Sequence, residues 1–119
     1  MNNLTELKST DFLTALASSA PAPGGGGGAA MAGALAAALA SMVANLTIGK
    51  EKFAQQELEV KELLDEAEEV RQTLLQLVED DAAVFNSFMA CYKLPKGTEE
   101  EKTARTQAIR QAAKQIGCQ

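Results

Sequence analysis

The sequence predicts an all-α protein, an antiparallel up-and-down bundle of one short and three longer helices. Apolar residues recur at steps of three and four along most of the chain, which is the helical period. No segment alternates apolar and polar positions with β-branched side chains, so strands are not expected. A length of 119 residues allows a single domain, residues 1–119, and 46% hydrophobic residues suffice for a small core.

The N-terminal part predicts a short helix followed by a turn. Ser9 or Thr10 can cap this helix, Asp11 favours its start, and Phe12 begins its apolar side. Residues 18–28 have the sequence SSAPAPGGGGG, and this proline-rich and glycine-rich composition predicts a turn before the next element.

The alanine-rich residues 29–48 predict a central helix. Its bulky apolar residues recur at helical spacing, namely Met31, Leu35, Leu39, Met42 and Leu46. The other faces carry small residues, which let neighbouring helices approach closely. We therefore expect a helix that is buried on nearly all sides and is closed by Gly49.

Two further helices follow in the prediction. From Glu51 to about Tyr92 no proline or glycine interrupts the chain, which predicts one helix about 60 Å long. The sequence LPKG at residues 94–97 breaks it. Thr98 and Glu101 have the spacing of a capping box that opens the final helix. The narrow apolar stripe of that helix consists of Ala104, Ala108, Ala112 and Ile116.

Composition excludes several classes of function. The chain has no histidine, which removes Ser-His-Asp and Cys-His catalysis, and its two cysteines form no CxxC motif. A net charge of -5 and few aromatic residues argue against a nucleic-acid partner. Residues 12–49 carry no charge, but prolines and glycines split this run, so no membrane span is expected. The N-terminus lacks the pattern of a signal peptide, and we expect a cytoplasmic protein.

The glycines from Gly24 to Gly28 are the first feature that could bind a ligand. Unhindered backbone N–H groups at the start of a helix, together with the positive end of the helix dipole, favour a carboxylate or a phosphate. The glycines could equally serve only to let helices pack tightly at a turn. The residues alone leave both interpretations open.

Asp81 is the second feature. The apolar stripe of the long helix includes Val78 and Phe85, and Asp81 stands where this stripe predicts a leucine, while Glu79 and Asp80 fall on wetter sides. A carboxylate held among apolar neighbours suits a general acid or base. The alternative is a structural aspartate bonded to a neighbouring helix. A metal site is not expected, because adjacent helical residues point about 100° apart.

Polar residues near the end of the alanine-rich helix form a third feature. Ser41, Asn45 and Thr47 are followed by Lys50, and together they could line a polar pocket. Such residues more often bond to the backbone or face a partner helix.

Five sequence features in order resemble one family. These are FL and LAS in residues 12–18, PAPGGG, an alanine-rich helix followed by MVANLTIGK, the segment EDDAAVFN, and LPK. The chain from about residue 9 to 119 resembles the cyclodeaminase domain of the formiminotransferase-cyclodeaminase family. This family contains formimidoyltetrahydrofolate cyclodeaminases and methenyltetrahydrofolate cyclohydrolases. Family domains continue through further helices after the position of Gln119, so the resemblance implies that the bundle is incomplete at its C-terminal end.

The resemblance also implies roles for particular residues. It makes Asp81 the catalytic acid–base residue. The positions that match the family's substrate-binding motifs are Pro23, Gly24, Gly25, Gly26, Asn45, Thr47 and Lys50. Gly27 stands where family members often have serine. Lys50 would attract the anionic glutamate tail of a folate.

The implied function is folate one-carbon chemistry. One expected reaction cyclises 5-formiminotetrahydrofolate to 5,10-methenyltetrahydrofolate with release of ammonia, and the other hydrolyses 5,10-methenyltetrahydrofolate to 10-formyltetrahydrofolate. Neither reaction requires a metal or a redox cofactor. The resemblance further implies a homodimer or higher homo-oligomer with the folate site near the subunit interface. The competing interpretation is a non-catalytic, truncated helical oligomerisation domain.

Overall fold

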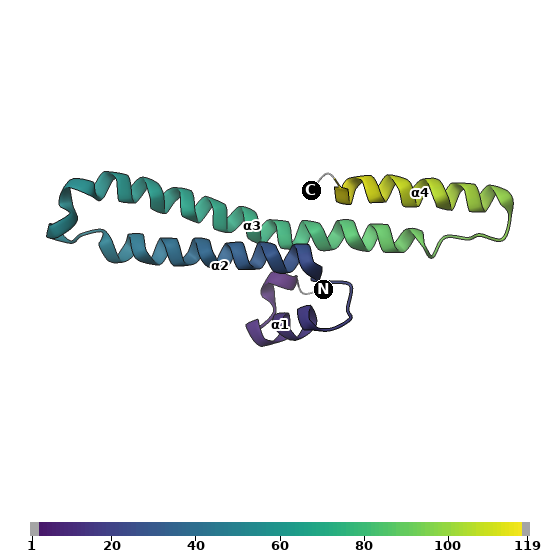
Figure 1. The fold of residues 1–119 in the computed structure, drawn as a ribbon, viewed down its shortest axis with the longest axis horizontal. Coiled ribbons are helices and arrows are strands. Elements are labelled where there is room, and N and C mark those ends of the chain that lie inside the picture. Colours follow the sequence, from purple (N-terminus) through teal and green to yellow (C-terminus); the bar gives the residue numbers. More distant parts are fainter. Residues whose placement is uncertain (1–2, 118–119) are drawn as a thin grey trace.

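The computed structural model describes residues 3–117, and their side chains as far as residue 114. The elements in order are the 3-10 helix η1 (Leu4–Glu6), α1 (Ser9–Ala17), α2 (Gly24–Thr47), the 3-10 helix η2 (Glu51–Gln56), α3 (Glu57–Cys91) and α4 (Glu99–Gly117). No strand occurs among the described residues, and the three long helices α2, α3 and α4 run up and down (Figure 1), while the short α1 lies across them. The predicted all-α fold is confirmed.

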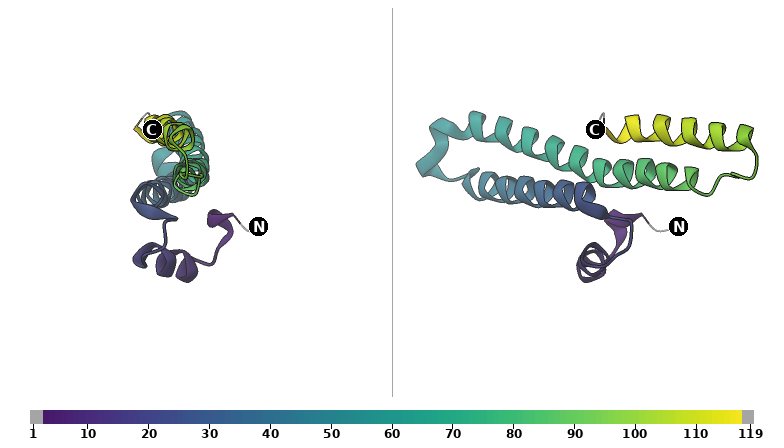
Figure 2. Two further views of the ribbon diagram at one scale, coloured as in Figure 1. Left: turned by 90° about the vertical axis from the view of Figure 1, so that its right-hand side faces the viewer. Right: turned by 45° about the vertical axis from the view of Figure 1, so that its right-hand side comes forward.

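The long helix α3 packs against both of the other long helices. In Figure 1, α2 runs antiparallel along the first half of α3, and α4 runs antiparallel along its second half. The short segments η1 and α1 lie near the start of α2, at the middle of α3 (Figure 2). The resulting shape is elongated, with extents of 74 × 28 × 20 Å. The two antiparallel pairs therefore share one helix without closing into a compact bundle.

The start of α2 differs from the prediction. The helix begins at Gly24, so Gly24–Gly28 form its first turn and the expected long turn ends at Pro23. Among the described residues, only Gly24 and Gly49 have positive φ, at 63° and 86°. Gly27 is buried, and a Cβ there would lie 3.2 Å from Pro23 and 3.9 Å from Val78. Close neighbours at Gly26, Gly27 and Gly28 offset the low intrinsic helix propensity of these three glycines. α2 ends at Thr47 with Ile48 at the C-cap, and Gly49 follows directly, in agreement with the predicted closure of the helix.

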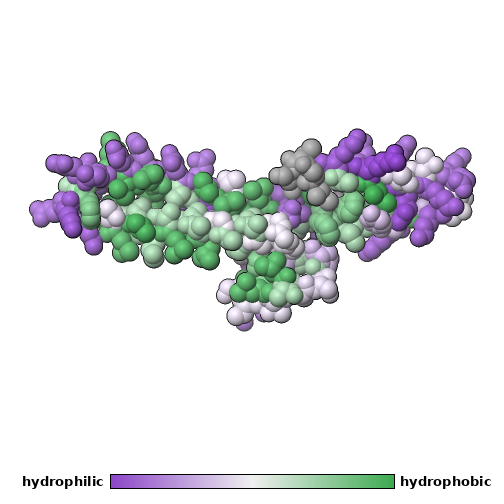
Figure 3. All heavy atoms as spheres, viewed as in Figure 1, coloured by the Kyte–Doolittle hydropathy of each residue, from purple (hydrophilic) through white to green (hydrophobic). Residues whose placement is uncertain are grey.

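Only one face of α2 is buried, whereas burial on nearly all sides was expected. Its buried residues are small, namely Gly27, Ala30, Ala34, Ala37, Ser41 and Ala44. The bulky stripe is exposed, with 64% of Leu35 and 61% of Leu46 accessible, and apolar surface gathers along α2 in Figure 3. The prediction of a helix buried on nearly all sides is wrong, because the small face allows α3 to approach closely and leaves the large side chains outside.

The exposed apolar residues give α2 a second property. Among residues 3–117, it is the one helix long and apolar enough to cross a membrane, with a mean hydropathy of 1.7 over its most apolar window. Length and composition alone do not distinguish such a span from an apolar helix that packs against other helices.

The junction after α2 and the cap of α1 also differ from the prediction. Residues 51–56 form the separate η2, because Phe53 has non-helical angles of φ -115° and ψ 20°. α3 begins at Glu57, whose Oε1 accepts a hydrogen bond from the Gly49 N–H at 2.9 Å. α1 begins at Ser9 with Lys8 at the N-cap and no side-chain cap, so neither Ser9 nor Thr10 plays the predicted role.

Of the two hydrogen bonds of the predicted capping box of α4, the one accepted by the threonine side chain is confirmed. The Glu101 N–H donates a hydrogen bond to Thr98 Oγ1 at 3.1 Å. Of the predicted apolar stripe, Ala112 is buried, Ala108 is half-buried and Ala104 is exposed, while the side chain of Ile116 lies outside the described residues.

The main core lies where the N-terminal segments meet α2 and α3. Phe12, Ala30 and Val78 are buried together, and none of the Val78 surface is accessible. The half-buried residues around them are Leu4, Leu7, Leu16, Met31 and Leu74. This core fixes the start of α2 against the middle of α3.

Candidate functional site

The candidate site is the contact between Asp81 on α3 and the first turn of α2. A Cβ placed on Gly26 would lie 2.9 Å from both Asp81 carboxylate oxygens and 3.0 Å from Cγ. Any larger residue at position 26 would collide with this carboxylate. Gly26 therefore leaves the space in which the carboxylate faces the backbone of α2.

The surroundings of Asp81 agree in part with the predicted stripe. Asp81 is half-buried beside the buried residues Val78 and Ala82. Asp80 is exposed as expected, and its Oδ1 accepts a hydrogen bond from Gln76 Nε2 at 2.9 Å. Glu79 does not lie on a wet face. It is half-buried, and its Oε1 accepts a hydrogen bond from the Thr5 N–H at 2.8 Å, which ties η1 to α3.

The glycine-rich start of α2 adds backbone donors beside this carboxylate. Pro23 is almost fully buried at the N-cap position, and within residues 3–117 no side chain caps the helix. The first N–H groups of a helix lack partners inside it, and they lie at the positive end of the helix dipole. No described neighbour lies within 4 Å of a Cβ built on Gly25. A negatively charged or carbonyl group can therefore approach these N–H groups from outside.

The structure does not bring the remaining predicted site residues to Asp81. Asn45 and Thr47 lie at the other end of α2, about 28 Å from Gly26 at 1.5 Å per residue, and Lys50 follows that end. Asn45 and Lys50 are exposed. The Thr47 hydroxyl donates to the Val43 carbonyl at 2.8 Å. In one copy of the chain, the predicted site is thus split into two separate groups.

A groove between α2 and α3 contains Thr47 and has a volume of about 630 Å³. Apart from Thr47 and Glu66, its lining is apolar and includes Val43, Val60 and Leu63. The groove lies far from Asp81 and offers little polar chemistry. We therefore assign the candidate site to Asp81 rather than to this groove.

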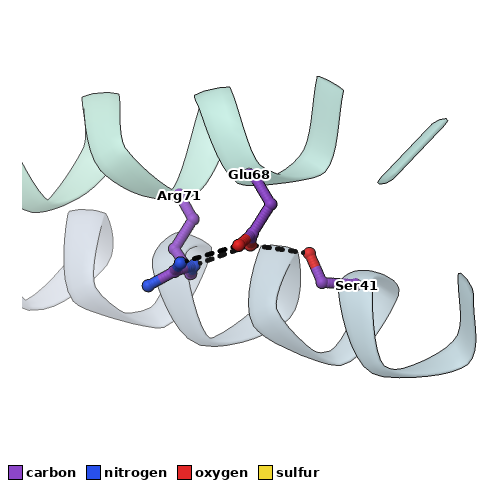
Figure 4. A network of polar contacts seen from close by, with 3 residues as sticks. All are labelled: Ser41, Glu68 and Arg71. Atoms are coloured by element: carbon purple, nitrogen blue, oxygen red, sulfur yellow. Dashed lines mark hydrogen bonds and ion pairs between the residues drawn. The ribbon is translucent and has the colours of Figure 1, made fainter. Parts of the chain in front are cut away.

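A polar network near the middle of α2 was not predicted in full. Ser41 is 6% exposed, and its hydroxyl donates to Glu68 Oε2 at 2.9 Å (Figure 4). Arg71 donates from Nε and from its terminal N–H group to the two Glu68 oxygens, each at 2.9 Å. The hydrogen bonds from Arg71, and then that from Ser41, lower the pKa of Glu68. The spacing of three residues between the oppositely charged Glu68 and Arg71 was the feature of the sequence that could have predicted this ion pair.

The described residues contain no cluster of side chains typical of a metal site. Within residues 3–117, no three His, Cys, Asp or Glu side chains come together as a metal-binding group. The groups that the described residues place at the site are one carboxylate and backbone N–H donors.

These features define a class of all-α proteins in which a carboxylate on a long helix faces the glycine-rich start of its antiparallel neighbour. The chain belongs to the formiminotransferase-cyclodeaminase family, whose sequence profile matches residues 8–117. The resemblance noted from the sequence motifs is confirmed.

Individual relatives carry two enzyme names. The chain is 52% identical over 103 residues to a methenyltetrahydrofolate cyclohydrolase of Methylorubrum extorquens, covering 87% of this chain and 50% of that protein. It is 36% identical over 103 residues to the formimidoyltransferase-cyclodeaminase of Gallus gallus, covering 87% of this chain and 19% of that one. The chain thus spans half the length of the first relative and about a fifth of the second.

A solved structure has the same fold. The crystal structure of formiminotetrahydrofolate cyclodeaminase from Thermotoga maritima matches with a TM-score of 0.69 and 30% sequence identity. The match covers 95% of this chain and 56% of that one.

Proposed function

We propose that the protein is a folate one-carbon enzyme that hydrolyses 5,10-methenyltetrahydrofolate to 10-formyltetrahydrofolate. The observation that carries the proposal is the contact of Asp81 with Gly26 at the start of α2, in a chain 52% identical to a methenyltetrahydrofolate cyclohydrolase. Asp81 acts as the acid–base residue, and Pro23 to Gly26 form the wall of the substrate site.

The hydrolysis needs two proton transfers at one carbon. The Asp81 carboxylate accepts a proton from water as the water oxygen bonds to the methenyl carbon. Asp81 then returns this proton to N5 as the bond between that carbon and N5 breaks. The added hydroxyl loses its proton to solvent, which leaves a formyl group on N10. Backbone N–H groups at the start of α2 stabilise negative charge on the carboxylate and on the added oxygen.

Cyclodeamination is the second candidate reaction. It is favoured by the similarity in fold to the Thermotoga maritima formiminotetrahydrofolate cyclodeaminase. In this reaction N10 attacks the carbon of the protonated formimino group, Asp81 accepts the N10 proton, and the amino group leaves as ammonia with the proton that Asp81 returns. The product is 5,10-methenyltetrahydrofolate, and no metal or redox cofactor takes part.

Absorbance of the methenyltetrahydrofolate band distinguishes the two reactions. Loss of the band from 5,10-methenyltetrahydrofolate indicates cyclohydrolase activity, and its appearance from 5-formiminotetrahydrofolate indicates cyclodeaminase activity. Asp81→Asn should lower turnover at least about a hundredfold, as expected for the loss of a general acid–base group. The control, Asp80→Asn, alters the exposed neighbouring carboxylate and should leave turnover unchanged.

Two outcomes would reject parts of this proposal. Full turnover by Asp81→Asn would remove Asp81 from the mechanism. A folded wild-type protein that is inactive on both substrates would favour the competing interpretation, a non-catalytic oligomerisation domain.

We also propose that the protein forms a homodimer through the exposed face of α2. Leu35, Leu39, Met42 and Leu46 are each at least half exposed, which is unfavourable for an isolated helix face in water. Antiparallel pairing of two α2 helices would bring the end of one, with Asn45 and Lys50, to the same end of the dimer as the glycine-rich start of the other. This arrangement would reunite the two groups of predicted substrate-binding residues.

Sedimentation of the protein tests the dimer. Leu39→Ser should weaken association, whereas the control Leu58→Ser removes an equally apolar residue, 73% exposed, from α3. Unchanged association in Leu39→Ser would move the interface away from α2. A requirement for detergent to keep the wild-type protein in solution would instead indicate a lipid-facing helix.

A further inference from the structure

We propose that the Ser41–Glu68–Arg71 network sets the axial register of α3 against α2, and thereby positions Asp81 opposite Gly26. The network would make Ser41 and Glu68 positioning residues for the reaction, although they lie far from Asp81. This inference rests on the proposed function for its catalytic consequence, but its structural part can be tested without activity.

The contacts between α2 and α3 all belong to one antiparallel register. Gly26 faces Asp81, and seven residues later on α2 Gly33 faces Leu74, seven residues earlier on α3. Eight residues beyond Gly33, Ser41 bonds to Glu68, six residues before Leu74. The polar network and the candidate site are therefore two points along the same helix pair.

Packing specifies this register unevenly, closely at the core near the start of α2 and more weakly around Ser41. The face of α2 against α3 consists of glycine, alanine and one serine, and small residues recur there at nearly every turn, as in Ala30, Ala34 and Ala37. Around Ser41 such a surface offers few protruding side chains to interlock with α3. Nearer the start of α2, Gly26 and Gly33 leave the room that Asp81 and Leu74 occupy. Single buried polar residues are known to fix the register of paired helices.

The geometry of the network suits this role. Ser41 is the single buried polar residue in the described core, and a slip would separate its hydroxyl from Glu68. Both Glu68 oxygens are held, one by Arg71 and the other by Arg71 and Ser41 together (Figure 4). The carboxylate thus has one fixed position from which it can accept the serine hydrogen bond.

α3 transmits this position to the site. Glu68 and Asp81 lie on one continuous helix, about 20 Å apart, with no proline or glycine between them. An axial shift at Glu68 therefore moves Asp81 relative to Gly26 by a similar distance. Misplacing a catalytic group by about 1 Å can lower a rate about a hundredfold.

Spin-label distances measure the register directly. In a protein whose Cys91 and Cys118 are replaced by serine, labels are placed through Ala32→Cys on α2 and Glu59→Cys on α3, both exposed positions. In the observed register these positions are about 24 Å apart along the helix axes, so a slip of one turn changes the separation by about 5 Å. The wild-type network should give one narrow distance distribution.

Ser41→Ala and Glu68→Ala are the test variants. Each should shift most molecules to a population displaced by about 5 Å, and each should therefore lower kcat about tenfold with little change in KM, because the site is misaligned rather than removed. The matched control, Glu69→Ala, removes the exposed neighbouring carboxylate and should keep the wild-type distance and kcat. Ser41→Ala should fold, since alanine has a higher helix propensity than serine.

The outcomes separate this proposal from the proposed function. A single wild-type distance in both Ser41→Ala and Glu68→Ala would overturn the register role, even if the wild-type protein is active. A shifted distance with an inactive wild type would support the register role and count against the proposed function. Lower kcat with an unchanged distance would also overturn the proposal, because the effect would not act through the register.

Discussion

Replacement of Gly26 by alanine tests the link between the start of α2 and Asp81 most directly. The new Cβ would lie 2.9 Å from both carboxylate oxygens, and ordinary contacts begin at about 3.4 Å. The carboxylate must therefore move by about half an ångström or rotate away. Because Asp81 is half-buried, its side chain has room to do so, and the backbone of α2 need not shift.

The magnitude follows from two opposing effects on stability and one on activity. Alanine gains about 1 kcal/mol over glycine within a helix, and the displaced carboxylate loses about the same or slightly more. The free energy of unfolding should therefore change by no more than about 1 kcal/mol. Turnover should fall about tenfold to a hundredfold, since the acid–base group has left its position.

Gly28→Ala is the matched control. Its Cβ would lie 2.9 Å from Leu16 Cδ1, so the collision is equally close, but the neighbour is an apolar side chain on α1. Urea unfolding and initial rates from the methenyltetrahydrofolate band should show similar stabilities for the two variants and loss of turnover only in Gly26→Ala. Wild-type turnover in Gly26→Ala would refute the argument that the absence of a side chain at Gly26 leaves the space that the Asp81 carboxylate needs.

Three further predictions concern stability. Hydrogen bonds from Arg71 and then from Ser41 lower the pKa of Glu68 below its ordinary value of 4.5. The ionised Glu68 carboxylate therefore stabilises the folded protein fully above pH 4.5, and this stabilisation is lost as the pH falls through the lowered pKa of the folded state. Urea titrations across this range should show that loss, and Glu68→Gln should remove it. Val78→Ala should lower the unfolding free energy by about 2 kcal/mol, because the Val78 side chain is fully buried. A loss of less than half this value, measured by thermal unfolding, would mean that the core relaxes into the space that the side chain leaves. Thr98→Ala should lower the stability of α4 by about 1 kcal/mol, seen as faster amide exchange confined to that helix, and uniform exchange rates would contradict a local cap.

Several features followed from the sequence because they depend on local spacing. The helical period predicted the all-α fold, Thr98 and Glu101 predicted the start of α4, and Gly49 marked the end of α2. The phase of the stripe on α3 also placed Asp81 on a more buried side than Asp80. These predictions succeed because hydrogen bonds and side-chain directions within one helix are set by neighbours three or four residues apart.

The partner of each helix face was decided only by the tertiary structure. The bulky stripe of α2 predicted burial, yet the opposite face of glycine, alanine and Ser41 packs on α3. The same packing pairs Gly26 with Asp81 and Ser41 with Glu68. Helical periodicity fixes the phase of a face along its own axis, but the partner and register of that face depend on how closely two backbones can approach. The sequence determined where the helices and the key carboxylate lie along the chain, and packing determined what the carboxylate faces.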